Sequence, residues 1–486
     1  MPENRNEFEL KPGKRKWLLY LPALVFLVSF YFSYPGVTVL QDEVTYIRQA
    51  VAYSEGKTTL EHINPLTGET TEVRPSDYPP GTSLLLTLFV LAGGWSASFW
   101  MPALCLIFAF YFTVLLLRSA GYSEWFACLY FIFLPALIMG RVASSDVLSA
   151  LIIAIGWWMF WKGDQRKEQD NRLAWWTSAG FVAGVSILFR ETNVLLFLPV
   201  FAGALFRQDR EWYWLLMGGL AGIAVRPGLS YLLFGDPFFI KDPHFGFSLE
   251  SVWMNTPVYL VMLLVFVPGG LYFAFIYKGN RRPEVITTIF LFVFFYLSYD
   301  FRGQHSGFAK SLVLGPRFFI PLLPVLYFAM AESAPRLLGA TRFFGKEMIS
   351  RLKFAGVAIT IISIITTNIL FYEWTRLQQD IQQSIIETVP TDASVVTNPM
   401  ATQKYISEIQ GYKKRMDVRL INPEELEGIA GFYIVFLQRS DSEYWRVEAE
   451  RGNLFLNSLQ TEMILEKSFH QTYHLKVYKS TNTKNE

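Results

Sequence analysis

The chain has 486 residues, of which 52% are hydrophobic, 17% are aromatic and only 17% are charged, with a formal net charge of +2. This composition is typical of a polytopic membrane protein, and the small net charge argues against a nucleic-acid partner. Both cysteines, Cys105 and Cys128, lie inside apolar runs, which argues against a disulfide framework or a zinc site.

Apolar runs long enough to cross a membrane recur along most of the chain. The first follows a basic flank but lacks a small-residue cleavage site, so we interpret it as a retained span. Eleven spans are predicted, at residues 17–34, 97–117, 124–142, 146–161, 173–189, 192–206, 212–234, 256–277, 285–300, 316–332 and 354–373. The apolar stretch at 81–94 is too short to cross and predicts an interfacial helix.

The distribution of lysine and arginine predicts the orientation. If residues 81–94 do not cross, the basic N-terminus and the later basic loops all fall on one side, which is then cytoplasmic. The long polar segments at 34–96, 235–255 and 300–315 would lie outside, together with the tail after Trp374.

In that tail, strand-like runs (ASVVT, GFYIVFLQ, YHLKVYK) alternate with helical-looking runs (MATQKYISEI, NLFLNSLQTEMILEKSF). The predicted fold class is therefore an all-α polytopic membrane protein with a small C-terminal α/β domain. Its predicted parts are a cytoplasmic N-terminus (1–16), a transmembrane domain (17–373) and an extracytoplasmic domain (374–486).

Adjacent carboxylates, Asp42 and Glu43, follow the first predicted span by a few residues. A carboxylate at the membrane surface can take a proton from an attacking hydroxyl group. The alternative is the acidic first turn of a solvated helix over 41–56, where negative charge favours the helix start. In the same outer segment, Tyr78 precedes a proline pair that predicts a fixed turn before the short apolar helix.

Further ionisable residues lie at the predicted outer edge of the membrane. Arg141 and Asp146 occupy opposite lips of two spans, where an interfacial anchor is the alternative reading, and Arg190 falls at a break between two others. Arg226 lies deeper, at a cost on the order of 3 kcal/mol, so it should face a structural partner, water or an anionic ligand. Arg317 follows a helix-breaking Gly-Pro pair, where its guanidinium suits a phosphate group.

The motifs QDEVTYI, YPPG, RVASSDVL, FGDPFF and GPRFFIPLLP occur in this order within about residues 17–332. With these motifs in this order, the chain resembles the integral-membrane glycosyltransferases of the GT-C fold, specifically the protein O-mannosyltransferase-like and aminoarabinose-transferase-like enzymes. The resemblance implies a polyprenyl-phosphate-linked sugar donor, a lipid, glycan or protein acceptor, and the plasma membrane of a bacterium or archaeon.

The same resemblance implies roles for single residues. Asp42 would be the catalytic base, with Glu43 as the second choice, and Arg317 would lie near the donor phosphate. The other substrate-binding candidates are Asp146, Arg190, Arg141, Tyr78, Lys241 and His244. Asp146 would lie near the acceptor or a metal ion, and the loop with Lys241 and His244 would help to close the site. Tyr78 is a departure, because the aminoarabinose transferases have a basic residue before the proline pair.

The expected reaction is a single displacement that inverts the anomeric centre. The sequence shows no histidine or cysteine cluster with metal-ligand spacing, so a divalent cation could bind only through carboxylates such as Asp42 and Asp146. The main alternative is a transporter or lipid flippase, which usually has its site near the midplane between inverted repeats. A second alternative is a catalytically silent scaffold whose tail binds a partner.

Overall fold

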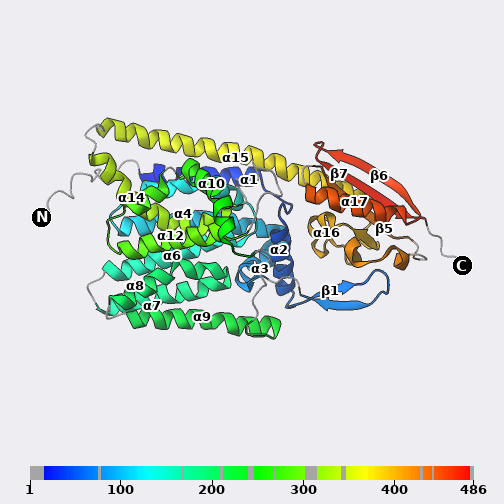
Figure 1. Ribbon diagram of the computed structural model, residues 1–486, viewed down its shortest axis with the longest axis horizontal. Helices are drawn as coiled ribbons and strands as arrows, with labels where there is room; N and C mark the ends of the chain where they lie inside the picture. The colour runs from blue at the N-terminus through cyan, green and yellow to red at the C-terminus, as the bar shows by residue number, and fades with distance from the viewer. Residues whose placement is uncertain are drawn as a thin grey trace.

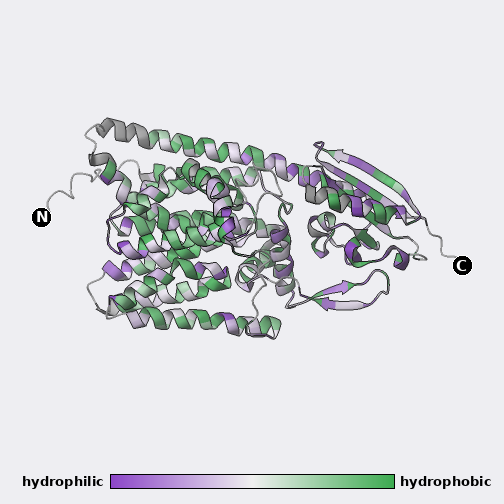
Figure 2. Ribbon diagram, in the orientation of Figure 1, coloured by the Kyte–Doolittle hydropathy of each residue, from purple (hydrophilic) through white to green (hydrophobic). Residues whose placement is uncertain are grey.

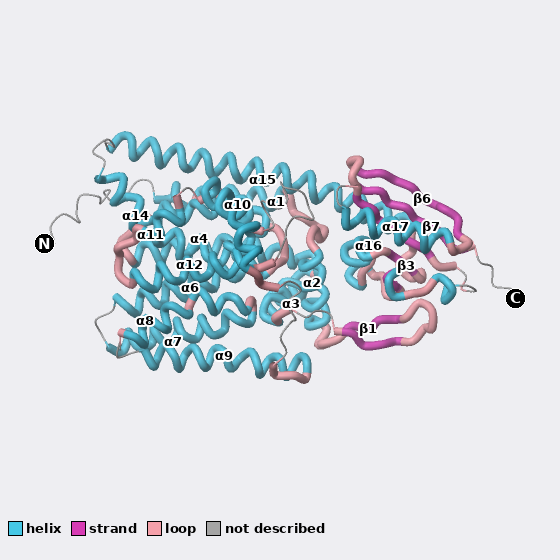
Figure 3. The backbone as a smooth tube through the Cα atoms, viewed as in Figure 1, coloured by secondary structure: helices cyan, strands magenta, loops and turns pink. Residues whose placement is uncertain are grey.

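The computed structural model describes residues 16–74, 78–165, 169–207, 212–238, 246–267, 269–300, 315–340, 346–426, 429, 431–440 and 443–481. Over these residues the chain forms a long helical bundle followed by a smaller sheet-containing unit, as Figure 3 shows. Figure 1 shows that α15 (Lys346–Thr388) runs along the bundle and continues into the smaller unit. The predicted domain boundary at 374 thus lies inside one continuous helix.

Apart from α15, the bundle consists of helices packed around one large apolar core. They are η1 (Lys16–Leu19), α1 (Leu21–Phe32), α4 (Trp100–Ser119), η3 (Glu124–Phe131), α5 (Leu134–Met139), α6 (Ser145–Gln165), α7 (Gln169–Val185), η4 (Ser186–Leu188), η5 (Glu191–Leu196), α8 (Leu198–Phe206), α9 (Trp212–Phe234), α10 (Leu249–Phe266), α11 (Gly270–Phe275), α12 (Arg282–Ser298), η7 (Pro316–Leu322) and α14 (Leu323–Ala340). Hydrophobic residues, coloured green in Figure 2, predominate along these helices.

Within the described residues, five helical segments are long and apolar enough to cross a membrane. They are Trp95–Ser119, Ser145–Gln165, Trp212–Phe234, Pro316–Leu337 and Phe354–Thr388. Each overlaps a predicted span, and the other predicted spans remain predictions.

Several predicted spans are interrupted where proline enters. The range 124–142 consists of the 3₁₀ segment η3 and the short α5, which has Pro135 in its first turn. The range 316–332 begins with the 3₁₀ segment η7, which contains Pro321. Because proline lacks an N–H group and restricts the preceding residue, it breaks the regular α-helical hydrogen-bond ladder at these points.

The outer segment between α1 and α4 has its own secondary structure. It contains α2 (Gln41–Ser54), β1 (Leu60–Ile63), β2 (Thr70–Val73), α3 (Pro80–Gly93) and η2 (Trp95–Phe99). Strands β1 and β2 form an antiparallel hairpin, which the sequence analysis did not predict. In Figure 1, α2 lies between the helical bundle and the C-terminal unit.

The C-terminal unit contains a five-stranded mixed sheet in the order β4-β3-β5-β7-β6. Its elements are β3 (Val395–Thr397), α16 (Pro399–Lys404), η8 (Glu408–Gln410), β4 (Arg415–Asp417), η9 (Val418–Leu420), η10 (Pro423–Leu426), β5 (Tyr433–Arg439), α17 (Glu443–Asn457), β6 (Thr461–Phe469) and β7 (Tyr473–Ser480). The end of α15 packs on one face of the sheet through Ile381 and Ile385, and α17 packs on the other through Phe455.

One secondary-structure prediction in this unit is wrong. Residues 453–469 read as a continuous helix, but α17 ends at Asn457 and residues 461–469 form strand β6. Strand β6 pairs antiparallel with β7 along its length, so hydrogen bonds to a neighbouring strand outweigh the local helical pattern.

Candidate active site

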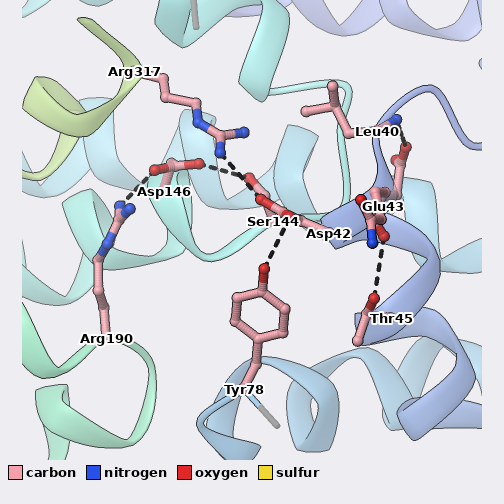
Figure 4. A network of polar contacts seen from close by, with 10 residues as sticks. Leu40, Asp42, Glu43, Thr45, Tyr78, Ser144, Asp146, Arg190 and Arg317 are labelled. Carbon is pink, nitrogen blue, oxygen red and sulfur yellow. Dashed lines mark hydrogen bonds and ion pairs between the residues drawn. The ribbon is translucent and has the colours of Figure 1, made fainter. Parts of the chain in front are cut away.

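Asp42 lies in the first turn of α2 and meets residues from two distant elements. Its Oδ1 accepts a hydrogen bond from the Tyr78 hydroxyl at 2.9 Å, and its Oδ2 forms an ion pair with Nη2 of Arg317 at 3.0 Å (Figure 4). The Asp42 side chain is 33% exposed, whereas the Arg317 side chain is only 10% exposed. The Asp42 carboxylate is thus held from two sides, while the side chain as a whole remains partly exposed.

Tyr78 is positioned by the turn that the proline pair creates before α3. Pro79 occupies the N-cap position in an extended conformation and Pro80 begins the helix, as expected for residues that favour a helix start. Burial and the neighbouring negative charge of Asp42 raise the pKa of Tyr78 far above its usual value. The Tyr78 hydroxyl therefore stays protonated and donates to Asp42.

A second ion pair, between Asp146 and Arg190, lies beside the first (Figure 4). Asp146 lies in the first turn of α6 and also accepts a hydrogen bond from the Ser144 hydroxyl at 3.2 Å. The Phe318 ring joins the two pairs, because its centroid lies 5.2 Å from the Arg190 guanidinium and 5.3 Å from that of Arg317. The Asp146 side chain is only 4% exposed, so it is far less accessible than Asp42.

Glu43, the other predicted catalytic residue, is fully buried and faces the backbone. Its Oε2 accepts hydrogen bonds from the N–H groups of Val39 at 2.7 Å and Leu40 at 3.4 Å, and its Oε1 accepts from Ala143 N–H at 2.8 Å. Burial raises the pKa of Glu43 to about 7, although these N–H donors and the charge of Lys404 act to lower it. Glu43 thus ties the start of α2 to the loop just before α6, the helix that carries Asp146.

The structure does not bring Arg141 to these ion pairs. Its guanidinium is fully buried and donates to the Leu137 carbonyl, to Ser29 of α1 and to Asn368 of α15. The same group lies 4.7 Å from the centroid of the Phe26 ring. Arg141 therefore fastens α5 to α1 and α15.

Three further residues were singled out from the sequence. Nη2 of Arg226 lies 2.7 Å from Oε1 of Glu191. Of the three neighbours expected from the sequence, a structural partner, water or an anionic ligand, Arg226 therefore has the structural partner. The predicted loop residues Lys241 and His244 lie outside the described residues.

A divalent cation would need several convergent oxygen ligands. Across the part of the chain that the structure describes, no group of three or more His, Cys, Asp or Glu side chains could hold a metal ion. Asp42 and Asp146 each engage an arginine instead.

Sequence reasoning missed two side chains of the site. Ser144 was visible as a polar residue just before Asp146, where a hydroxyl can bond the helix's first turn. Phe318 gave no distinguishing signal, because an aromatic residue in an apolar run is usually core.

No protein-family model and no curated protein matches this chain. Solved structures do match it, and they show that the chain has the fold of the GT-C integral-membrane glycosyltransferases. The structure of ArnT from Cupriavidus metallidurans bound to undecaprenyl phosphate matches with a TM-score of 0.62 at 12% identity. The match covers 96% of this chain and 98% of that one.

Two further solved structures also match this chain. ArnT from the same organism in the apo state gives a TM-score of 0.61 at 13% identity, covering 95% of this chain and 97% of that one. The apo oligosaccharyltransferase of Archaeoglobus fulgidus gives 0.46 at 13% identity, covering 87% of this chain and 70% of that one. The likeness to ArnT at this identity is one of fold, and it confirms the resemblance inferred from the ordered motifs.

Proposed function

We propose that this chain is a membrane glycosyltransferase that moves a sugar from a polyprenyl-phosphate donor to an acceptor hydroxyl group. The observation that carries the proposal is the partly exposed Asp42 side chain, whose carboxylate is held between Arg317 and Tyr78. The fold shared with ArnT, whose structure contains undecaprenyl phosphate, supports a lipid-phosphate donor. The acceptor is a lipid, a glycan or a protein.

Asp42 is assigned as the general base. It is the most exposed of the three carboxylates that the structure brings together, at 33% against 4% for Asp146, while Glu43 is fully buried. In the proposed step the acceptor hydroxyl gives its proton to Asp42 as its oxygen bonds the anomeric carbon. The bond from that carbon to the phosphate oxygen breaks, so the anomeric centre inverts.

Arg317 is assigned to the departing lipid phosphate. A guanidinium offers a planar fork of donors that matches phosphate oxygens, and charge that develops on the leaving group is stabilised most by preorganised donors in a dry site. Inversion requires the acceptor hydroxyl and Asp42 to lie on the face of the anomeric carbon opposite the departing phosphate, so Arg317 would exchange its contact with Asp42 for one with the phosphate when the donor binds. Asp146 and Arg190 extend the same polar cluster and are assigned to substrate positioning.

The proposed orientation puts the N-terminus in the cytoplasm and the C-terminal unit outside, with eleven spans between them. Its support is the distribution of lysine and arginine, which collects the basic loops on one side. The polar cluster of Asp42 and Arg317 would then face the extracytoplasmic edge of the membrane.

The test is sugar transfer from a panel of radiolabelled polyprenyl-phosphate monosaccharides. Purified protein in detergent-lipid micelles is supplied with extracts that contain lipid, glycan and protein acceptors, and wild type is compared with Asp42→Asn. Turnover of one donor by wild type, lost in the variant, is expected. If every donor stays intact with wild type, the proposal is overturned and transport becomes the better reading.

A further inference from the structure

The C-terminal unit makes direct contact with α2, the helix that carries Asp42. Helix α2 contacts both α16 and η8, and Figure 1 shows it at the junction between the bundle and this unit. The contact joins segments that are some 360 residues apart in the sequence. The contact therefore exists only in the folded chain, and any effect that it has on the site is a tertiary one.

The centre of the contact is an ion-pair cluster around Glu408. Nε of Arg48, on α2, lies 3.0 Å from Oε2 of Glu408, and its Nη2 donates to Oε1 at 3.2 Å. On the other side, Nη2 of Arg415 lies 2.6 Å from Oε1 of the same carboxylate. The side chains of Arg48, Glu408 and Arg415 are 19%, 13% and 9% exposed, so solvent screens them little.

The negative charge of Glu408 is stabilised by both arginines. Burial by itself would raise the pKa of Glu408, but Arg415 and Arg48 together hold it below the usual value. Glu408 therefore stays ionised and keeps both arginines near it. The two arginines are not equivalent, because Arg415 belongs to the C-terminal unit whereas Arg48 belongs to α2.

Other contacts fasten the same outer segment to the last part of the chain. Nε2 of Gln379, on α15, donates to the Pro35 carbonyl at 2.9 Å, just before α2. Leu66, in the turn of the β1–β2 hairpin, packs against the apolar cluster that includes Ile421 and Phe432. Ile409, next to Glu408, packs against the apolar core of the bundle. The outer segment thus contacts α15 or the C-terminal unit at three places: before α2, along α2 and in the hairpin that follows it.

Along α2, Glu43 and Arg48 act on different neighbours. Glu43 fixes the helix start to the loop before α6 through Ala143 N–H, and Arg48 fixes the middle of the helix to Glu408. Asp42 precedes both of these residues on α2, and its own carboxylate contacts Arg317 and Tyr78. Two fixed points on one rigid helix set both its position and its rotation, which decides where the Asp42 carboxylate points.

We propose that Arg48 is a positioning residue: through Glu408 it lets the C-terminal unit hold α2 in the orientation that presents Asp42 to the substrate. The claim that this contact aligns a catalytic base rests on the proposed function. The claim that Arg48 holds α2 in place does not. It gives the C-terminal unit a role in aligning the catalytic base, separate from any contact with the acceptor.

The test compares Arg48→Met with the matched variant Arg415→Met in the full-length protein. Each removes one arginine and leaves Glu408 paired with the other, so both variants should fold. The first readout is hydrogen–deuterium exchange of the α2 backbone amides in detergent-lipid micelles. Arg48→Met should speed their exchange about tenfold, as expected for loss of one hydrogen-bonded charge pair, whereas Arg415→Met should leave it near the wild-type rate.

The second readout is the kinetics of sugar transfer. Arg48→Met should lower kcat about tenfold with the donor KM within about twofold, because the base is misaligned while the donor contacts remain. Glu408→Gln should reproduce the loss, and adding Arg48→Met to it should cause little further loss, since both act through one contact.

Unchanged α2 exchange in Arg48→Met, or equal effects of Arg48→Met and Arg415→Met, would overturn the inference. The exchange readout needs no turnover. If wild type transfers no sugar from any donor, the proposed function fails, while the exchange result still decides whether Arg48 holds α2.

Discussion

Nη2 of Arg317 lies 3.0 Å from Oδ2 of Asp42, although the two residues are 275 positions apart in the sequence. The pair links the first turn of α2 to the start of η7. An arginine beside the proposed base has two consequences. It orients the Asp42 carboxylate before substrate arrives, and in the proposed reaction its guanidinium would bind the phosphate group whose charge grows.

Replacing Asp42 with asparagine should abolish turnover without unfolding the protein. The amide keeps the size of the side chain and an oxygen acceptor for Tyr78, but it cannot take a proton. Because general-base catalysis contributes about 10²–10⁴ to the rate, kcat should fall at least about a hundredfold. Donor affinity, measured by equilibrium binding of the labelled lipid, should stay within a few-fold.

The matched control for this variant is Glu55→Gln, just after α2 on an exposed side chain. It removes one carboxylate from the same region and should leave kcat unchanged. Full activity in Asp42→Asn would remove Asp42 from the mechanism.

Replacing Arg317 with lysine should weaken the reaction even though the positive charge is kept. Lysine is a point charge and cannot present the planar fork that bonds two phosphate oxygens, so kcat/KM for the donor should fall about ten- to a hundredfold. The control is Arg141→Lys, because Arg141 is buried against α1 and α15, where it donates to Ser29 and Asn368 and not to Asp42 or Asp146. Equal losses in kcat/KM, after correction for stability, would argue against a phosphate contact at Arg317.

The sequence was informative wherever the chemistry of a side chain is unusual for its surroundings. Charged side chains stand out beside long apolar runs, so Asp42, Asp146, Arg190 and Arg317 could be singled out without a structure. Their pairing could not be predicted, because it depends on how α2, α6, η5 and η7 pack together.

Other parts of the site gave misleading signals or none. Glu43 and Asp42 are adjacent in the sequence and chemically alike, but successive residues point in different directions on a helix, so one is partly exposed and the other is fully buried. The Arg48–Glu408 contact joins two ordinary charged residues from segments that meet only in the folded chain, and charge pairs of this kind carry no local sequence pattern. Strand β6 was misread because its pairing with β7 is a tertiary contact.

Replacing Gly81 with alanine should distort the turn that carries Tyr78. A Cβ atom at Gly81 would lie 2.6 Å from the Leu188 carbonyl oxygen, and a backbone atom of this kind cannot move aside as a flexible side chain can. Overpacking of this kind typically costs about 1–3 kcal/mol, and the shift of α3 should also lower kcat. Thermal unfolding and transfer assays on the purified variant measure both effects.

The comparison variant is Gly356→Ala, within α15, where a Cβ would meet nothing within 4 Å. There the substitution should leave stability unchanged or raise it by about 0.5–1 kcal/mol, because alanine is favoured over glycine inside a helix. If Gly81→Ala behaves like Gly356→Ala, α3 does not pack against η4 as closely as the structure shows.

The buried Glu43 should make the stability of the protein depend on pH in a defined window. Burial raises the pKa of Glu43 in the folded protein to about 7, above its ordinary value of 4.5. Between these two values the folded protein holds a proton that the unfolded chain has released. The free energy of unfolding should therefore fall as the pH rises from about 4.5 to about 7, by on the order of 3 kcal/mol.

The variant Glu43→Gln isolates this contribution, because glutamine does not titrate and the other ionisable groups remain. Denaturant unfolding at several pH values should show the fall in wild type and a correspondingly flatter dependence in Glu43→Gln. At the acid end the protonated wild-type side chain resembles the amide, so the two proteins should be closest in stability there. The same pH dependence in both would mean that the carboxylate is ionised throughout the window. The backbone donors from Val39, Leu40 and Ala143 would then outweigh the effect of burial, and Glu43 would brace α2 as an anion rather than as a neutral acid.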